Sequence, residues 1–505
     1  MIKFLNNKIV HFIAQTGIYI PCIFFLIMIS LMPIGSLNEF SSDEGINLIK
    51  GLLYKNNYEL YTQIWSDQAP LFTVILSWWF KFIGTNIFAA RLLVLFFSCM
   101  LLWAFFMSLR LSISTPSTIL AVIFLIISFC YIRFSVSVMI GLPSVAFAMI
   151  SLYLIILSSN NKHHILLICT SAMFMAISLQ TKLITAIIVP IIMGYILYNG
   201  LLRTYNIGGL KNCLGNIALW GLILVTSFSI IGITFGFNMD QMLKTHLGEN
   251  VENKFTVYSN LTDISENLFK RHLIYFPIAL FGIIWAIRSK KHIIAVPLIW
   301  FCISLLFLFN HKPLWWHHEL LTTVPLTWLT AFGIEGWFVK FKKNTESDNR
   351  PHKIAFSFLK TKQIVLILVA IVVIIFTIQY PMSIQQRIKE ENIILNNFSY
   401  EIYNQLTIDA RTKPGWIFTD RPIYAFHVGL PVPPEIAVIT KKRIWSNEIP
   451  ADLLLKVIKT YQPEYIILQR FLYSYPEVVM DYIDKNYFLK IDDKRYKYYT
   501  RLSQK

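Results

Sequence analysis

Long apolar stretches, separated by short polar connections, fill most of the first 381 residues. A helix needs about 20 mostly apolar residues to cross the hydrocarbon core of a bilayer. The pattern therefore predicts a mainly α-helical polytopic membrane protein with about 11 transmembrane helices. The predicted spans are 17–36, 87–107, 118–136, 139–157, 165–180, 183–199, 213–236, 273–288, 293–310, 319–339 and 363–381.

Two shorter patterns fall in the first large loop, residues 37–86. Residues 46–54 have the hydrophobic periodicity of a short amphipathic helix. Residues 70–84 are apolar but too short to span, and their Trp78 and Trp79 suit a membrane interface. We therefore predict juxtamembrane helices in this loop, the second lying on the membrane surface.

The tail, residues 382–505, has the composition of a soluble domain. Residues 416–420 and 465–468 read as buried strands, and 451–460 as a helix that begins after Pro450. Residues 488–502 alternate like a closing hairpin. A small α/β domain is the predicted structure.

Lysine and arginine gather in alternate connections between the spans. If the N-terminus is inside, the inner connections are strongly basic and their only acids are Glu346 and Asp348. Because cytoplasmic connections are typically basic, we predict this orientation. It puts the 37–86 loop, the 237–272 loop, the 311–318 turn and the tail outside. The predicted domains are a transmembrane domain, 1–381, and an extracytoplasmic domain, 382–505.

Composition excludes several other classes of protein. Only 14% of the residues are charged, against about 25% in soluble domains. The net charge is +17, but basic and aromatic residues do not form a stripe on a soluble domain. This distribution argues against nucleic acid as a partner. The six cysteines lie in or beside apolar spans, so neither a disulfide framework nor a CxxC metal site is indicated. Neither a GxGxxG motif nor a Walker lysine motif is present.

Asp43 and Glu44 follow the first predicted span and open the first outer loop. A carboxylate at a membrane interface can act as a general base or bind a divalent cation. Adjacent carboxylates point in different directions, so at most one is expected to do the chemistry. The competing interpretation is that this pair only caps the following helix.

Basic candidates occur at three further places in the sequence. Lys312, His317 and His318 lie in a turn predicted to be on the same outer side, and Trp315 and Trp316 there suit interface anchors. Cations and donors at an interface suit a lipid phosphate. Charged residues at membrane depth are also site candidates, although long side chains can snorkel to the interface. These are Arg91, at the start of the second span, and Lys182, between the fifth and sixth.

An ordered set of motifs resembles the GT-C membrane glycosyltransferases. The branch it resembles is family-39-like, with the protein O-mannosyltransferases and the lipid A aminoarabinose transferase as relatives. The motifs are Asp43-Glu-Gly-Ile-Asn-Leu, Gly51-Leu-Leu-Tyr54, Ala69-Pro70-Leu-Phe, Phe82-Ile-Gly84, Ala90-Arg91-Leu, Gly141-Leu-Pro143, Leu179-Gln-Thr-Lys182, Lys312-Pro-Leu-Trp-Trp-His-His318, Asp420-Arg-Pro-Ile-Tyr-Ala-Phe and Leu430-Pro-Val-Pro-Pro434.

The resemblance implies inverting transfer of a hexose or pentose from a polyprenyl-phosphate donor to a lipid, glycan or protein acceptor on the outer face. Asp43 matches the catalytic aspartate, with Glu44 beside it in the catalytic site. The candidate ligands of the donor phosphate are Lys312, His318, His317, Arg91 and Lys182. The implied location is a bacterial inner or plasma membrane. No cofactor is certain; a divalent cation is left open and its ligands are unknown.

Two departures from the family pattern narrow this expectation. Ala69 stands where the aminoarabinose branch has lysine, which argues against lipid A as acceptor. Leu142 stands where many relatives have aspartate, which argues against a second acidic site and any metal it would bind. Two other functions stay open: a transporter or flippase of lipid-linked glycans, and a non-catalytic subunit of an envelope assembly.

Overall fold

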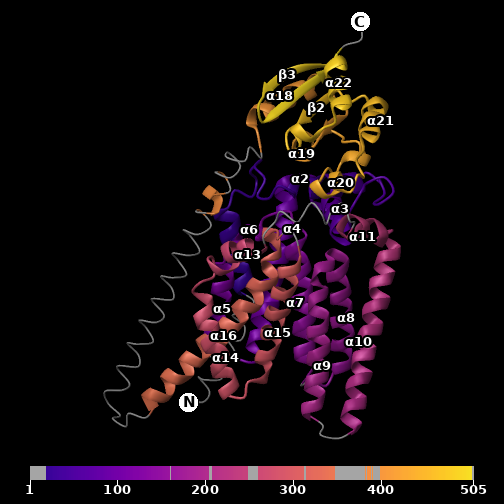
Figure 1. Cartoon of the computed structure of the whole chain (residues 1–505). Helices are drawn as coiled ribbons and strands as arrows, with labels where there is room; N and C mark the ends of the chain where they lie inside the picture. The colour runs from indigo at the N-terminus through magenta and orange to yellow at the C-terminus, as the bar shows by residue number, and fades with distance from the viewer. Residues whose placement is uncertain are drawn as a thin grey trace.

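A helical bundle carries a small α/β region on one of its ends (Figure 1). The computed structural model describes residues 19–159, 161–203, 207–247, 260–311, 314–346 and 398–502, and a few residues between 382 and 389. Helices make up most of this part of the chain, and its one named sheet lies near the C-terminus. The predicted fold class, a mainly helical polytopic membrane protein with a small C-terminal α/β structure, is confirmed at this level.

Six helices in the described part are long and apolar enough to cross a membrane, and a bent pair adds a seventh candidate. The pair, α5 (Thr115–Ile126) and α6 (Phe129–Ser135), bends by 72°. The six spans fall on α4 (Ile87–Arg110), α7 (Gly141–Ser158), α8 (His164–Thr181), η1 (Leu183–Ile188) with α9 (Val189–Arg203), α10 (Ile207–Thr234), and η4 (His292–Ile294) with α15 (Ala295–Asn310).

Three further predicted spans also coincide with helices. These are the helix Tyr19–Leu31, α14 (Tyr275–Arg288) and α16 (Leu320–Glu346). The first two are shorter than a full span and α16 contains Pro325. The last predicted span, 363–381, lies outside the described residues. The total of eleven therefore stays a prediction.

Lipid-facing surface is visible in the pattern of exposure. α7 lies between α4 and α8 and is buried along most of its length. On α10, by contrast, Leu222, Val225, Ile230 and Ile233 are all more than 60% exposed. A soluble monomer rarely shows so large an apolar surface, whereas lipid covers one without a penalty.

The first loop folds into two short helices at the end of the bundle that carries the α/β region (Figure 1). They are α2 (Glu44–Lys55) and α3 (Leu71–Ile83), so both predicted helices are confirmed. At about 1.5 Å per residue, the 13 residues of α3 are too short to cross a bilayer. The smaller elements near this end are α11 (Met239–Leu247), α13 (Asn260–Ile264), η3 (Ser265–Phe269) and η5 (Trp316–His318).

The C-terminal α/β region, residues 398–502, is built on a four-stranded sheet of order β1-β2-β4-β3. β1 and β2 are parallel, while β4 is antiparallel to both β2 and β3. The predicted strands, helix and hairpin are all present; the boundary at 382 is untested. The elements are α18 (Tyr400–Thr412), β1 (Ile417–Thr419), α19 (Pro422–Val428), η6 (Pro434–Ile436), α20 (Lys441–Trp445), α21 (Ala451–Tyr461), β2 (Tyr465–Leu468), η7 (Leu472–Ser474), α22 (Glu477–Asn486), β3 (Tyr487–Asp493) and β4 (Tyr496–Arg501).

The hydrophobic core is continuous between the bundle and the C-terminal α/β region. One cluster of buried side chains runs from α2 and α4 into Ile423, Tyr424 and Phe426 of α19. Gly45 of α2 allows the close approach, because a Cβ there would lie 2.7 Å from the backbone nitrogen of Ile423. The C-terminal α/β region is thus packed directly onto the first loop.

Candidate active site at the end of the bundle

Asp43 stands at the N-cap position of α2, but its carboxylate makes no capping hydrogen bond to the helix. Its side chain is 39% exposed. One carboxylate oxygen accepts a hydrogen bond of 3.0 Å from Nη2 of Arg470, in the C-terminal α/β region. The capping interpretation therefore does not account for this side chain, which is turned toward solvent and a distant arginine.

Glu44, the next residue, is fully buried against Arg91 of α4. Arg91 donates from Nε (3.3 Å) and Nη2 (2.9 Å) to the two oxygens of Glu44. It also donates to the backbone carbonyls of Ile34 (3.1 Å), Ser36 (2.8 Å) and Asn38 (2.7 Å). A guanidinium has five N–H donors, so every donor of Arg91 is used.

The Glu44 carboxylate is equally saturated. Besides Arg91, it accepts from the backbone N–H groups of Phe40 (2.5 Å) and Val138 (2.7 Å). The pair therefore ties the first loop to α4 and to the connection before α7. A catalytic role for Glu44 and phosphate binding by Arg91 do not fit this geometry, because neither group has a free atom to offer a substrate. These contacts favour a structural role for Glu44 and Arg91.

Two lysines and four histidines from five parts of the chain lie near one another, and the charge of Asp43 acts on both lysines. The ring centroids of His318 lie 4.4 Å from His317 and 5.0 Å from His311. Lys182 follows α8 directly, and its positive charge acts on all four histidines. We call the set the basic cluster: Lys182, His246, His311, His317, His318 and Lys442.

Burial and neighbouring positive charges lower the pKa values of the side chains in the basic cluster, which favours their neutral forms in the free protein. Burial, reinforced by the nearby Lys442, lowers the pKa of Lys182 to about 7. Burial likewise lowers the pKa of His311 to about 4 and places the pKa of His317 and His318 well below the ordinary value. An anion entering the cluster would favour the protonated forms and reverse these shifts.

Asp67, in the connection between α2 and α3, partly balances the cluster. Burial raises the pKa of Asp67, but His246, Lys442 and Lys50 outweigh burial and the net pKa is lowered. The Nε2 of His246 lies 3.9 Å from Oδ2 of Asp67. Burial also lowers the pKa of His246, while the negative charge of Asp67 acts in the opposite direction.

His318 offers an unused polar atom. Its side chain is 4% exposed, and Nδ1 is buried with no hydrogen-bond partner among the described residues. Buried polar atoms in native proteins are nearly always paired. An anionic oxygen from a ligand would satisfy this nitrogen.

The C-terminal α/β region is fastened to the first loop beside the site. Nη1 of Arg421 lies 2.8 Å from Oε2 of the buried Glu39. Nε1 of Trp65 donates to Glu448 at 2.6 Å, and the guanidinium of Arg443 lies 4.8 Å from the ring centroid of Trp65. Residues separated by more than 380 positions in the sequence thus share one surface.

Sequence reasoning found part of this arrangement. Lys182 lies within electrostatic reach of Asp43 and of His317 and His318. Arg91 and Glu44 form a separate buried pair, and Lys312 lies outside the described residues. Lys442 and Arg470 were missed, because no local pattern in the tail marks them. No group of three or more histidine, cysteine or acidic side chains in the described part could hold a metal ion.

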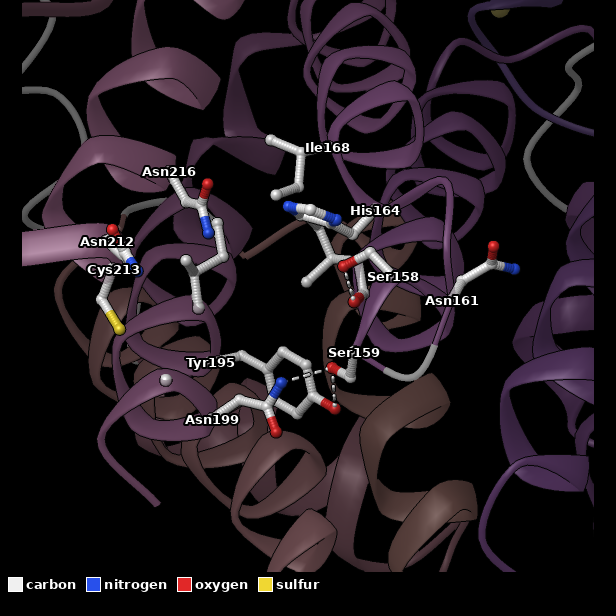
Figure 2. Close-up of a pocket in the computed structure, with 13 residues that line it drawn as sticks. Ser158, Ser159, Asn161, His164, Ile168, Tyr195, Asn199, Asn212, Cys213 and Asn216 are labelled. Atoms are coloured by element: carbon white, nitrogen blue, oxygen red, sulfur yellow. Dashed lines mark hydrogen bonds between the residues drawn. The ribbon is translucent and has the colours of Figure 1, made fainter. Parts of the chain in front are cut away.

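A cavity of about 500 Å³ lies at the opposite end of the bundle (Figure 2). It opens among the ends of α7 and α9 and the starts of α8 and α10. Ser158, Ser159, Asn199, Asn212 and Asn216 give it uncharged polar walls, and Asn199 donates to Ser159 at 2.6 Å. This cavity is separate from Asp43 and from the basic cluster.

No family model and no curated protein sequence matches the chain. Solved structures do match over nearly its whole length. ArnT from Cupriavidus metallidurans in the apo state gives a TM-score of 0.65 at 12% identity, covering 97% of this chain and 98% of ArnT. The same protein bound to undecaprenyl phosphate gives 0.63 at 11% identity, with the same coverage.

A second match is the archaeal oligosaccharyltransferase AglB from Archaeoglobus fulgidus, in complex with an inhibitory peptide and a dolichol-phosphate. Its TM-score is 0.51 at 10% identity, and the match covers 97% of this chain and 74% of AglB. ArnT and AglB are both GT-C glycosyltransferases. The chain therefore has the fold of the GT-C membrane glycosyltransferases, which confirms the resemblance predicted from its sequence motifs.

Proposed function

We propose that this protein is an integral membrane glycosyltransferase. It moves a sugar from a polyprenyl-phosphate donor to an acceptor on the outer face of the membrane, with inversion at the anomeric carbon. The observation that carries the proposal is the half-exposed carboxylate of Asp43 beside the basic cluster, in a fold shared with ArnT. The solved ArnT complex with undecaprenyl phosphate supports the donor class.

Asp43 acts on the acceptor in this proposal. Its carboxylate accepts the proton of the acceptor hydroxyl while the hydroxyl oxygen attacks the anomeric carbon. Asp43 is the suited carboxylate because Glu44 is buried and fully hydrogen-bonded. The bond between the anomeric carbon and the phosphate oxygen breaks, and its electron pair leaves with the lipid phosphate.

The basic cluster acts on the leaving group. The leaving phosphate gains negative charge as the glycosidic bond breaks, and cations already in position stabilise it without reorganisation. Lys182 and Lys442 supply charge, and Nδ1 of His318 supplies an unpaired polar atom. Lys182 takes up a proton as the phosphate binds, because its pKa of about 7 in the free protein rises beside an anion.

The test uses protein purified in detergent with undecaprenyl-phosphate sugars, one hexose or pentose at a time. Membranes of a strain lacking this protein supply the acceptor. Wild-type protein should transfer label, and Asp43→Asn should lower the rate by about 10²–10⁴-fold, the usual contribution of a general base. Asp481→Asn removes an exposed aspartate of α22 and should leave the rate unchanged. Normal turnover by Asp43→Asn would remove Asp43 from the mechanism.

A further inference from the structure

The connection after β2 carries Arg470 from the C-terminal α/β region to Asp43. Nη2 of Arg470 donates to Oδ1 of Asp43 at 3.0 Å, and Nη1 donates to the backbone carbonyl of Ser42 at 3.3 Å. The arginine side chain is 22% exposed. Two neighbouring acceptors on the first loop therefore fix the guanidinium, and it in turn fixes one oxygen of Asp43.

Asp420 holds this connection in place from within the C-terminal α/β region. It is 1% exposed and follows β1, which runs parallel to β2. Its Oδ1 accepts from the backbone N–H of Gln469 at 2.9 Å, and its Oδ2 accepts from that of Phe471 at 2.7 Å. The backbone on both sides of Arg470 is thus anchored to one buried carboxylate.

Neighbouring contacts hold the same part of the C-terminal α/β region on the first loop. Arg421, adjacent to Asp420, pairs with Glu39 on the first loop, and Ile423 packs against Gly45 of α2. The approach of Arg470 to Asp43 is therefore determined at several points on both sides of the contact.

The geometry of in-line displacement indicates whether Arg470 lies on the side of the acceptor or on the side of the donor phosphate. An inverting reaction puts the acceptor and the leaving phosphate on opposite faces of the anomeric carbon, and the base stands on the acceptor's face. Arg470 contacts the base itself, whereas the basic cluster suits the phosphate. We propose that Arg470 is a positioning residue on the acceptor side, so that the C-terminal α/β region completes the active site. This inference rests on the proposed function.

The need for such a residue follows from the position of Asp43. The carboxylate of Asp43 makes no capping hydrogen bond and is 39% exposed even with Arg470 in place, so removal of Arg470 would let staggered rotamers compete. A misplacement of about 1 Å in a catalytic group can cost about 10²-fold in rate. Arg470 selects the rotamer that meets the acceptor hydroxyl.

The experiment compares wild type with Arg470→Ala, Arg470→Lys and the control Arg495→Ala, using the undecaprenyl-phosphate sugar assay. Arg495 also belongs to an arginine–aspartate pair, with Asp493 at 2.8 Å, on the far hairpin of the same region. We expect Arg470→Ala to lower kcat by about 100-fold with an unchanged KM for the donor. Arg470→Lys should recover part of the loss, and Arg495→Ala should equal wild type.

Binding of undecaprenyl phosphate alone, followed as a shift in thermal stability, provides a readout besides turnover. Arg470→Ala should bind it as wild type does, and its stability without ligand should also match wild type, because the removed side chain is partly exposed. A raised donor KM or weaker undecaprenyl phosphate binding would place Arg470 on the phosphate side and overturn the inference. Wild-type turnover by Arg470→Ala would overturn it too.

The outcomes separate this inference from the proposed function. Wild-type protein without transfer activity would refute the function and the inference together. Active wild type, inactive Asp43→Asn and fully active Arg470→Ala would refute only the inference.

Discussion

Replacement of Glu44 by glutamine distinguishes a structural acid from a catalytic one. Glutamine keeps the size of the side chain and removes its charge, while Arg91 stays in place. In the wild type the two carboxylate oxygens accept four hydrogen bonds, two from Arg91 and one each from the N–H groups of Phe40 and Val138. A glutamine has one oxygen and one NH₂ group in these positions, so two of the four donors would meet another donor.

The size of the effect follows from this count. Whichever way the amide faces, one hydrogen bond to the Arg91 guanidinium and one to a backbone N–H are lost. Arg91 is fully buried, so its charge would be left without a counter-charge. Breaking a buried ion pair by removing one partner costs about 3–5 kcal/mol. We expect Glu44→Gln to lower the free energy of unfolding by an amount of this order.

Thermal unfolding of the detergent-purified protein, followed by intrinsic tryptophan fluorescence, measures the change. Glu59→Gln is the matched control, because Glu59 lies exposed in the same loop and should change stability by less than about 0.5 kcal/mol. The reasoning is refuted if Glu44→Gln unfolds like wild type. Unchanged stability together with lost transfer activity would restore Glu44 to the catalytic site.

The remaining predictions concern the phosphate site, the packing of the first loop and the topology. Because Lys182 has a pKa of about 7, its charged fraction falls by about fivefold from pH 7 to pH 8. The KM for the donor should therefore rise with pH in wild type but not in Lys182→Gln. A KM that does not change with pH in wild type would exclude Lys182 as a ligand of the phosphate. Gly45→Ala should cost about 1–3 kcal/mol in the same unfolding assay, because its Cβ would meet the backbone of Ile423. Reporters fused at 350 and 440 should report inside and outside respectively; the reverse result would overturn the orientation.

Hydropathy and turn chemistry predicted most of the fold. Apolar stretches of the right length gave helices at every predicted span that falls within the described part, and Pro450 correctly marked the start of α21. These features depend on neighbours in the sequence, which periodicity captures. The bend between α5 and α6 escaped prediction, because residues 118–136 are mostly apolar and read as one span despite Arg133.

The site was less predictable because its parts meet only in three dimensions. Asp43 and Lys182 lie in motifs that resemble the family. They lie near each other because the helices that carry them have their ends at the same side of the bundle. Arg470 lies 427 residues after Asp43, and nothing in its local sequence marks the contact. Arg91 was assigned to phosphate because a charge at membrane depth suggests a ligand; its partner proved to be the buried Glu44.

The docking of the C-terminal α/β region onto the first loop has a consequence for biosynthesis. Glu39 pairs with Arg421, and Asp43 pairs with Arg470. Neither ion pair can form until almost the whole chain has been synthesised. At about 5–20 residues per second, the 427 residues between Asp43 and Arg470 correspond to about 20–90 s of synthesis. During that interval Glu39 and Asp43 lack these two arginine partners. A nascent or truncated chain that ends before Arg470 therefore carries Asp43 without the arginine that contacts it, and this contact can form only after most of the C-terminal α/β region has been synthesised.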